Sequence, residues 1–307
     1  MDDSWLIIVN PNAGRRKAEK DWNIIENLLI SEGFQFAYVF TKEKLHAVSL
    51  TSEYIQKGYR KFIAVGGDGT LNEVVNGIFS QKNIATTEFT LGAITIGTGN
   101  DWGRMYNIPT QYSDAIKTIK KGKTFVQDVG LINYFDSNEE KQRYFINMAG
   151  MGFDAQVAKR TNRQKEAGRG GGFSYLLNIF SALWSHVDKQ VNIKIDSESF
   201  KFKMFTMSVG ICKYNGNGMM QAPNAIPDDG LLDFTVIKDI TKFKVVRSVH
   251  KLYDGSYTAL PEVKTFQGKE IEIFANKEIF LEADGESLGH SPFKFQIIPK
   301  SIRVIIN

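Results

Sequence analysis

The chain has 307 residues, of which 42% are hydrophobic and 23% are charged, and its net charge is +4. This length exceeds what one hydrophobic core usually takes, which predicts two domains, and the ordinary composition excludes a disordered or low-complexity chain. The weak positive charge argues against nucleic acid as a partner, although it favours approach to an anionic membrane surface. Cys212 is the only cysteine, which excludes an internal disulfide and a thiolate metal cluster.

No apolar stretch approaches the roughly 18 residues that a membrane-spanning helix needs. The first residues, Met1 to Ser4, lack the basic start of a secretory signal. We therefore expect a cytoplasmic protein.

Predicted strands and helices alternate over residues 1–127. Apolar runs predict strands near 5–9, 34–40, 62–65 and 91–96, and helical spacing predicts helices near 17–31, 45–57, 70–80 and 111–121. This alternation is typical of an α/β domain with a doubly wound parallel sheet. The loops that follow the strands of such a sheet meet at one edge, where ligands bind.

Strands dominate the rest of the chain. We expect them near 143–148, 191–195, 201–212, 231–237, 270–274, 279–283, 293–298 and 303–306. Their succession predicts a second domain that is an antiparallel β-sandwich with inserted helices.

The loop after the third predicted strand has the residues of a phosphate site. Glycines allow backbone N–H groups to approach an anion, and a helix that begins at Thr70 would point its N-terminus at the same anion. Thr70 and Glu73 have the spacing of a capping box. Asp68 predicts a divalent cation between its carboxylate and the phosphate, although an ordinary strand-to-helix turn is the alternative. The loop reads Gly66, Gly67, Asp68, Gly69, Thr70, Leu71, Asn72 and Glu73.

Two further loops repeat this order of strand, glycine-containing loop and helix. The loop after the first strand precedes the basic residues 15–17, which suit a polyphosphate, and the loop after the fourth strand adds a second carboxylate. Because the three loops should emerge at one edge of the sheet, we expect them to form one site. They comprise Asn10, Pro11, Asn12, Ala13 and Gly14, and Gly97, Thr98, Gly99, Asn100 and Asp101.

The motifs NPNAG at 10–14, GGDGTLNE at 66–73 and GTGND at 97–101 together resemble the diacylglycerol kinase catalytic family. That family contains soluble bacterial lipid kinases, sphingosine kinases and ceramide kinases. Further matches follow in the family's order: GMGFDA at 150–155, GNGM at 216–219, AP at 222–223, DDGLLD at 228–233 and DGE at 284–286. Two departures are visible: Thr95-Ile96 stands where a proline is often found, and Asn217 interrupts a glycine run.

The resemblance implies a nucleotide-binding α/β domain like that of NAD kinases and phosphofructokinases, formed by residues 1–127 with a returning strand at about 299–307. It implies a lipid-binding β-sandwich domain of residues 128–298. The implied reaction is transfer of the γ-phosphoryl group of ATP to a lipid hydroxyl, with diacylglycerol as the leading acceptor.

The resemblance also implies roles for single residues. Asp68 is the expected metal-side carboxylate, with Asp101 and Asp128 acting through water. Thr41 and Thr98 are implied nucleotide contacts, although loop hydroxyls of this kind also serve as caps.

Glu286, within Asp284-Gly285-Glu286, is implied to be the general base that accepts the proton of the lipid hydroxyl. The alternative is that Asp284 and Glu286 only stabilise a hairpin turn.

A structural Mg²⁺ is implied at the carboxylate of Asp229 and the backbone carbonyls of Ile226 and Leu231, since oxygen ligands suit a hard cation. The alternative is a turn in which the carboxylates of Asp228 and Asp229 cap loop amides.

An apolar, aromatic segment at 173–184 follows a basic stretch, which includes Lys159, Arg160, Arg163, Lys165 and Arg169, and a glycine loop at 168–172, for which we predict mobility. It is either a membrane-contacting helix or a core helix beside a solvated basic loop.

The expected partners are ATP, Mg²⁺ and a lipid alcohol at a membrane surface, with transient peripheral association, and a homodimer is a further expectation. Sphingoid-base or ceramide kinase activity, an NAD kinase-like enzyme and a nucleotide-binding regulator without catalysis are the alternatives. The second Gly-Ser-Thr nucleotide motif of NAD kinases is not found, and the intact motif at 284–286 argues against a regulator.

Overall fold

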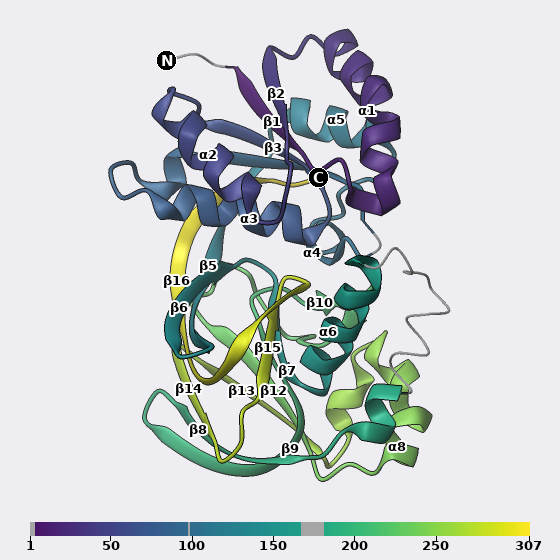
Figure 1. Cartoon of the computed structure of the whole chain (residues 1–307), viewed down its shortest axis with the longest axis vertical. Helices are drawn as coiled ribbons and strands as arrows, with labels where there is room; N and C mark the ends of the chain where they lie inside the picture. Colours follow the sequence, from purple (N-terminus) through teal and green to yellow (C-terminus); the bar gives the residue numbers. More distant parts are fainter. Residues whose placement is uncertain (1–3, 98, 167–180) are drawn as a thin grey trace. The chain divides into compact units, whose positions relative to one another are not determined.

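The computed structural model describes residues 4–97, 99–166 and 181–307 (Figure 1). The chain divides into two compact units: unit 1 comprises Met1–Val129 and Ile298–Asn307, and unit 2 comprises Gly130–Ile297. The glycine loop at 168–172 and most of the apolar segment at 173–184 lie outside the described residues.

Unit 1 contains a parallel sheet in the order β2-β1-β3-β4-β16. Its last position is filled by the end of the long strand β16, where Arg303 and Val304 pair with β4. The parallel sheet confirms the predicted α/β class. The strands are β1 (Trp5–Val9), β2 (Phe36–Phe40), β3 (Lys61–Gly66), β4 (Thr90–Thr95) and β16 (Glu286–Ile305).

Helices cover both faces of this sheet (Figure 1). On one face, Trp22 and Ile25 of α1 and Ile116 of α5 pack on alternate strand residues such as Ile7 and Ile63. α2 and α3 cover the opposite face, as a doubly wound sheet requires. The helices are α1 (Ala13–Ser31), α2 (His46–Gln56), α3 (Asp68–Ser80), the 3₁₀ turn η1 (Thr86–Glu88), α4 (Asp101–Met105) and α5 (Tyr112–Lys121).

The predicted capping box at the start of α3 is wrong. The helix begins at Asp68 with Gly67 as its N-cap, and no side chain caps it. The Thr70 hydroxyl accepts a hydrogen bond from Asn10 Nδ2 at 3.1 Å. The buried Glu73 carboxylate accepts from the N–H groups of Leu45 at 2.9 Å and Ala47 at 3.1 Å, at the start of α2. Glu73 therefore caps the neighbouring helix instead of its own.

Unit 2 is built on antiparallel strand pairs. Around one circuit, β9, β7, β15, β16, β14 and β8 pair in turn, and β8 pairs with β9 again. This arrangement confirms the predicted antiparallel sandwich domain. β5 (Thr124–Asp136) begins in unit 1 and continues into unit 2. The other strands of unit 2, besides the first part of β16, are β6 (Glu139–Phe145), β7 (Met148–Gly152), β8 (Lys189–Ile195), β9 (Glu198–Gly210), β10 (Tyr214–Asn215), β11 (Met219–Met220), β12 (Leu232–Lys238), β13 (Val263–Gly268), β14 (Glu270–Ala275) and β15 (Phe280–Ala283).

Helical segments are inserted between these strands. Phe153 and Val157 of α6 form a buried cluster with Leu183 and Phe205, against which Val245 of α8 packs. The inserted segments are α6 (Phe153–Glu166), a helical turn at 181–185, α8 (Lys242–Ser248), η2 (Val249–Leu252) and η3 (Ser256–Ala259).

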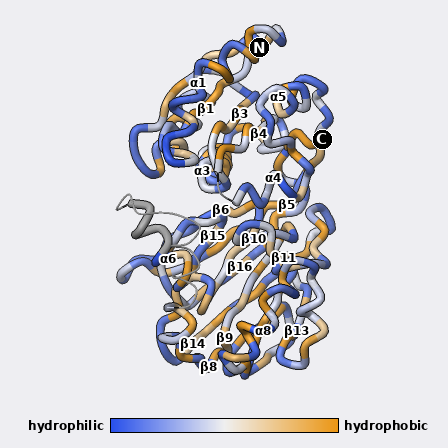
Figure 2. Tube along the Cα trace, turned by 90° about the vertical axis from the view of Figure 1, so that its right-hand side faces the viewer, coloured by the Kyte–Doolittle hydropathy of each residue, from blue (hydrophilic) through white to orange (hydrophobic). Residues whose placement is uncertain are grey.

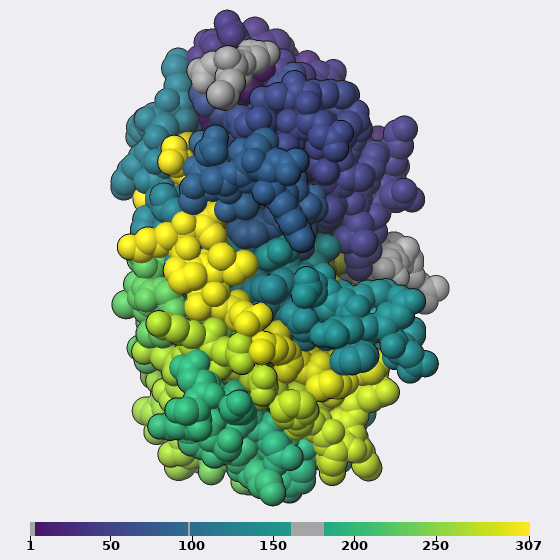
Figure 3. All heavy atoms as spheres, turned by 90° about the vertical axis from the view of Figure 1, so that its left-hand side faces the viewer, coloured from purple at the N-terminus to yellow at the C-terminus, as the bar shows by residue number. Residues whose placement is uncertain are grey.

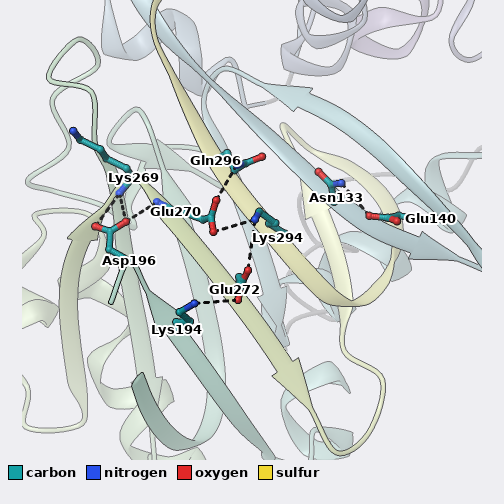
Figure 4. Close-up of polar contacts among 9 residues, drawn as sticks. All are labelled: Asn133, Glu140, Lys194, Asp196, Lys269, Glu270, Glu272, Lys294 and Gln296. Atoms are coloured by element: carbon teal, nitrogen blue, oxygen red, sulfur yellow. Dashed lines mark hydrogen bonds and ion pairs between the residues drawn. The ribbon is translucent and has the colours of Figure 1, made fainter. Parts of the chain in front are cut away.

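Cross-strand charges stabilise the register of β8, β14 and β16. Glu272 lies opposite both Lys194 and Lys294, at 3.9 and 3.5 Å, and Glu270 accepts from Lys294 at 3.0 Å (Figure 4). The alternate residues Ile271 and Ile273 are fully buried. A register slip of one residue would bury the charged side chains and expose the isoleucines. Figure 3 shows the green surface of the β8–β9 hairpin beside the yellow-green surface of later strands.

Two strand predictions need correction. The strand expected at 143–148 is the end of β6 and the start of β7, with a bend between them. The strands expected at 293–298 and 303–306 are parts of the single strand β16, which bends at Lys300, where φ is 45°. The strands β5, β10, β11 and β13 were not predicted.

Replacing Glu73 with alanine should lower the free energy of unfolding by about 1–3 kcal/mol, because two N–H groups of α2 lose their acceptor. Urea denaturation measures the change. Glu53→Ala removes an exposed pair with Lys57 on α2 and should cost less than about 1 kcal/mol. Equal costs for the two variants would contradict the assigned role of Glu73.

Candidate functional site

The loops at the carboxyl ends of the unit 1 strands are joined by hydrogen bonds. Asn10 N donates to Val65 O at 3.0 Å, Thr41 N donates to Val9 O at 2.8 Å, and Ile96 N donates to Gly66 O at 2.7 Å. The loops that follow β1, β2, β3 and β4 are therefore brought together at one edge. This edge is where a parallel sheet places its ligands.

Glycine is required where two of these loops meet. A Cβ on Gly97 would lie 2.5 Å from Asn100 Oδ1 and 3.0 Å from the Cα of Gly67. The backbones of the two loops are thus in direct contact. Such an arrangement leaves backbone N–H groups accessible to an anion without side chains in the way.

The loop after β1 has an unusual backbone. Gly14, Arg15 and Arg16 all have φ near 60°, and the following regular helix corresponds to the predicted start at Lys17. Positive φ is uncommon for residues with a Cβ, and such strain gathers at ligand-binding turns.

Asp68 binds the start of α4 through both carboxylate oxygens. Its Oδ2 accepts from Asp101 N at 3.2 Å, and its Oδ1 accepts from Trp102 N at 3.1 Å. A carboxylate at this position is favourable because the N-terminus of a helix carries partial positive charge. Asp68 therefore fixes the loop after β4.

The residues at Gly99 fit a Mg²⁺ ion that also binds phosphate. A Cβ on Gly99 would lie 3.0 Å from Asp101 Oδ2 and 3.3 Å from Asp68 Oδ2, so two carboxylates flank one point. Mg²⁺ in kinases commonly takes one or two carboxylates and completes its shell with water and phosphate oxygens. Among the described residues, no group of three or more His, Cys, Asp or Glu side chains could hold a metal ion.

Asn100 presents an acceptor for which the described residues offer no hydrogen-bond partner. Its Oδ1 is buried without a partner, while its Nδ2 donates to Gly97 O at 3.2 Å. A ligand hydroxyl or a metal-bound water would satisfy such an oxygen. Thr98, an implied nucleotide contact, lies outside the described residues.

Three further predicted residues of unit 1 are buried away from these loop contacts. Asp128 is fully buried, and its Oδ1 accepts from Lys300 N at 2.6 Å, where β16 returns to unit 1. Leu71 is buried in α3, and Asn72 is bound by Asn76 on the same helix. These contacts give the three side chains structural roles.

In unit 2, Asp284 and Gly285 form a two-residue hairpin turn between β15 and β16. Both have positive φ, 47° and 83°, and Ala283 pairs with Glu286. Asp-Gly is the favoured sequence for a turn of this type. The half-buried Glu286 is the first residue after the turn.

The buried Asp284 carboxylate holds the bend between β6 and β7. It accepts from the N–H groups of Ile146 at 3.0 Å, Asn147 at 3.1 Å and Met148 at 3.0 Å. The hairpin that carries Glu286 is thereby fixed to β7.

Glu282 supports the same hairpin, and the sequence reasoning missed it. Its Oε2 accepts from Gly285 N at 3.1 Å, and its Oε1 accepts from Asn215 Nδ2 at 3.0 Å. Glu282 lies opposite Gly150, where a Cβ would come within 2.7 Å of Oε1. Burial raises the pKa of Glu282 to about 8, and burial raises the pKa of nearby Asp154 to about 6. The charge of Asp154 adds to the shift at Glu282.

Asp229 lies in a turn. Its Oδ1 accepts from Leu231 N at 3.0 Å, while Gly230 has a φ of 77° and the Ile226 side chain is exposed. One carboxylate oxygen is therefore used by the turn, and the other is an oxygen ligand of the kind that a hard cation takes.

Comparison with known proteins identifies the family. The YegS C-terminal NAD kinase beta sandwich-like domain matches residues 147–306, just over half of the chain, and the diacylglycerol kinase catalytic domain matches residues 4–132. The two matched domains define a lipid kinase. The chain belongs to the family that joins these two domains, which confirms the resemblance drawn from the motifs.

Individual relatives match nearly the whole chain. A diacylglycerol kinase of Staphylococcus saprophyticus is 28% identical and covers 97% of this chain and 93% of its own length. A diacylglycerol kinase of Staphylococcus epidermidis is 29% identical, with coverage of 97% and 90%. The fold is shared with the solved structure of a diacylglycerol kinase from Bacillus anthracis, at a TM-score of 0.74, 24% identity and coverage of 99% and 97%.

The raised pKa of Glu282 predicts that stability falls as pH rises. The folded state keeps the Glu282 proton up to about pH 8, whereas the unfolded carboxyl loses it near its ordinary pKa of 4.5. Stability that is fully present below pH 4.5 is therefore lost as the pH rises toward 8, at about 1.4 kcal/mol per pH unit at most.

Between pH 6.5 and 8, the pH dependence of stability reports on Glu282. The ordinary and the shifted pKa values of Asp154, Asp233 and His186 all lie at or below about 6.5. Glu282→Gln should flatten the dependence of the unfolding free energy on pH in this interval, whatever its absolute stability. Denaturation at several pH values measures the slope. An unchanged slope would contradict the assignment.

Proposed function

We propose that this lipid kinase transfers the γ-phosphoryl group of ATP to the free hydroxyl of a lipid alcohol, with diacylglycerol as the leading acceptor. The observation that carries the nucleotide part is the contact of Gly67 and Gly97 beside the Asp68 carboxylate, which binds the N-terminus of α4. The names of the relatives support diacylglycerol as the acceptor.

Phosphoryl transfer requires charge neutralisation and in-line positioning more than covalent help from the protein. The loops at 10–14, 66–73 and 97–101 would hold the triphosphate. Asp68 and Asp101 would hold Mg²⁺, which when bound offsets the charge that develops on the phosphoryl group. Thr41 directly follows β2, at the same edge of the parallel sheet as the three loops, and would contact the nucleotide there.

Glu286 would act as the general base toward the lipid hydroxyl. Its carboxylate would accept the proton as the lipid oxygen forms a bond to the γ-phosphorus. The bond between this phosphorus and the β–γ bridging oxygen breaks, and ADP leaves with its electron pair. Support comes from the turn: Asp284 accepts from N–H groups of the bend between β6 and β7, and Glu282 accepts from Gly285 N within the turn, so Glu286 follows a fixed hairpin.

The acceptor would be reached from the surface of a membrane. Among the described residues, no helix is long and apolar enough to cross a bilayer. Transient peripheral association is therefore the form of membrane contact that we propose.

Incubation with γ-labelled ATP and Mg²⁺ tests the proposal, with diacylglycerol, a sphingoid base, ceramide and NAD offered separately. Label in diacylglycerol is the expected result. Label in NAD alone would indicate an NAD kinase-like enzyme. Nucleotide binding without transfer to any acceptor would indicate a regulator, and either result would overturn the proposal.

Glu286→Gln should slow turnover by about 10²- to 10⁴-fold with little change in ATP affinity, because the base is lost while the nucleotide loops are intact. Steady-state kinetics and nucleotide titration measure the two effects. Glu139→Gln, at an exposed position on β6, is the matched control. Turnover close to wild type would remove Glu286 from the chemistry, and lost ATP affinity would move it to the nucleotide site.

Asp229→Ala should abolish a Mg²⁺-dependent gain in thermal stability, if the turn at 226–231 binds the cation through Asp229. Melting temperatures are compared with Mg²⁺ and with a chelator. Asp228→Ala, one residue away, should keep the difference. A wild-type melting temperature that chelation leaves unchanged would exclude this metal site.

A further inference from the structure

Exposed apolar side chains gather on one surface of unit 2. Six of the thirteen large hydrophobic residues that are exposed in the described chain belong to it. We call it the α8 surface, and it comprises Trp184, Val187, Phe243, Val246, Val249 and Tyr253, with exposed fractions of 68, 71, 77, 41, 42 and 55%. The remaining seven are spread over other elements.

Helical spacing explains how α8 and η2 contribute to this surface. Phe243, Val246 and Val249 are three residues apart and Tyr253 follows four residues later, so they share one face of the helical run. Val245 points the other way and packs on the cluster of Phe153 and Leu183. The run is therefore anchored by its inner face, while its outer apolar face is exposed.

The helical turn at 181–185 extends the same surface. Lys242 Nζ donates to Trp184 O at 2.6 Å, which joins α8 to this turn, and the two segments lie side by side in Figure 1. Within the turn, Ala182 and Leu183 are buried and Trp184 is exposed. Figure 2 shows hydrophobic and hydrophilic residues close together at α8.

The charge on this run has one sign. Residues 240–253 contain Lys242, Lys244, Arg247 and Lys251, and no Asp or Glu. Lys244 is paired with Glu262, whereas Arg247 is exposed at the end of α8. Aromatic and aliphatic side chains flanked by basic residues are the pattern of a segment that lies in the interface of an anionic membrane.

We propose that the α8 surface is the membrane-docking surface of this protein and that its partner is an anionic lipid bilayer. The proposal rests on the proposed function, because a diacylglycerol acceptor is held in a bilayer by its acyl chains. A second copy of the chain is a poorer partner, since a two-fold contact through this surface would place the basic residues of both copies against each other. The insertion of Phe243 and Tyr253 below the headgroups would bring the enzyme to the layer that contains its substrate.

Sedimentation with vesicles of phosphatidylcholine, with or without phosphatidylglycerol, tests the proposal on the full-length protein. Phe243→Ala/Tyr253→Ala should weaken binding to anionic vesicles by roughly tenfold or more, since each side chain loses its burial in the membrane. Arg247→Gln/Lys251→Gln should weaken binding to anionic vesicles by about tenfold and leave the weak binding to phosphatidylcholine unchanged.

Matched controls lie elsewhere on unit 2. Phe274→Ala removes an exposed phenylalanine of β14, and Lys264→Gln/Lys277→Gln removes two exposed lysines. Both controls should bind vesicles as the wild type does. Equal binding by the wild type and the Phe243→Ala/Tyr253→Ala variant would overturn the proposal, and so would equal losses in the variants and the controls.

Tryptophan fluorescence gives a second measurement on the unmodified protein. Of the four tryptophans, Trp22 and Trp102 are buried, Trp5 is half-buried in unit 1 and Trp184 is exposed, so brominated lipids in anionic vesicles should quench Trp184. The quenching should disappear in Trp184→Phe. Quenching that persists in this variant would place the contact elsewhere and contradict the proposal.

Kinetics separate this proposal from the proposed function. The Phe243→Ala/Tyr253→Ala variant should lose activity on long-chain diacylglycerol in vesicles and keep wild-type activity on short-chain diacylglycerol in detergent micelles. A wild type that phosphorylates no lipid in either form would refute the proposed function. A wild type that is active in both, with a variant that is equally active on vesicles, would refute only the docking surface. A variant that changes oligomeric state while it binds vesicles normally would show a protein interface instead.

Discussion

Carboxylates that accept backbone N–H bonds from a neighbouring segment are the interaction on which the loops of unit 1 and the Asp284 hairpin of unit 2 each depend. Asp68 holds the first N–H groups of α4, Glu73 holds those of α2, and Asp284 holds three in the bend between β6 and β7. A hydrogen bond to an ionised acceptor is stronger than one between neutral groups, and an unsatisfied buried N–H is costly. These side chains therefore determine where the loops lie before any ligand binds.

A consequence is that the motifs contain two kinds of acidic residue. Asp128, Glu73 and Asp284 are buried and engaged with backbone, so their removal affects the fold first. Asp68 combines both functions in our proposal, because it fixes α4 and stands beside Asp101 at Gly99. Glu286, the general base in our proposal, follows a turn that the carboxylates of Asp284 and Glu282 hold.

Many of the strands, helices and turns could be predicted from the sequence, because periodicity and turn preferences depend on residues that are close together in the chain. The alternation of strands and helices in unit 1 and the hairpin at Asp284-Gly285 follow from spacing and from Asp-Gly preference. The role of Glu73 could not be predicted, since its spacing to Thr70 indicates a cap on its own helix. The N–H groups that it binds become available only because α2 packs beside α3. Glu282 was missed because its raised pKa comes first from its own burial and then from the charge of Asp154, a residue distant in sequence.

The continuous strand β16 was divided in the prediction for the same reason. Its bend at Lys300 resembles a strand end in the sequence, and the partner that stabilises the bend, Asp128, is 172 residues away. Local patterns therefore predicted the elements, while contacts between distant residues decided which carboxylates are structural.

Amide hydrogen exchange in Asp68→Asn and Asp284→Asn tests the central claim most directly. Each substitution leaves a side chain of the same shape that is a weaker acceptor with one oxygen fewer. The account predicts faster exchange at residues 101–102 in Asp68→Asn and at residues 146–148 in Asp284→Asn, with each effect confined to its own segment. Exchange at these amides that matches the wild type in both variants would contradict it.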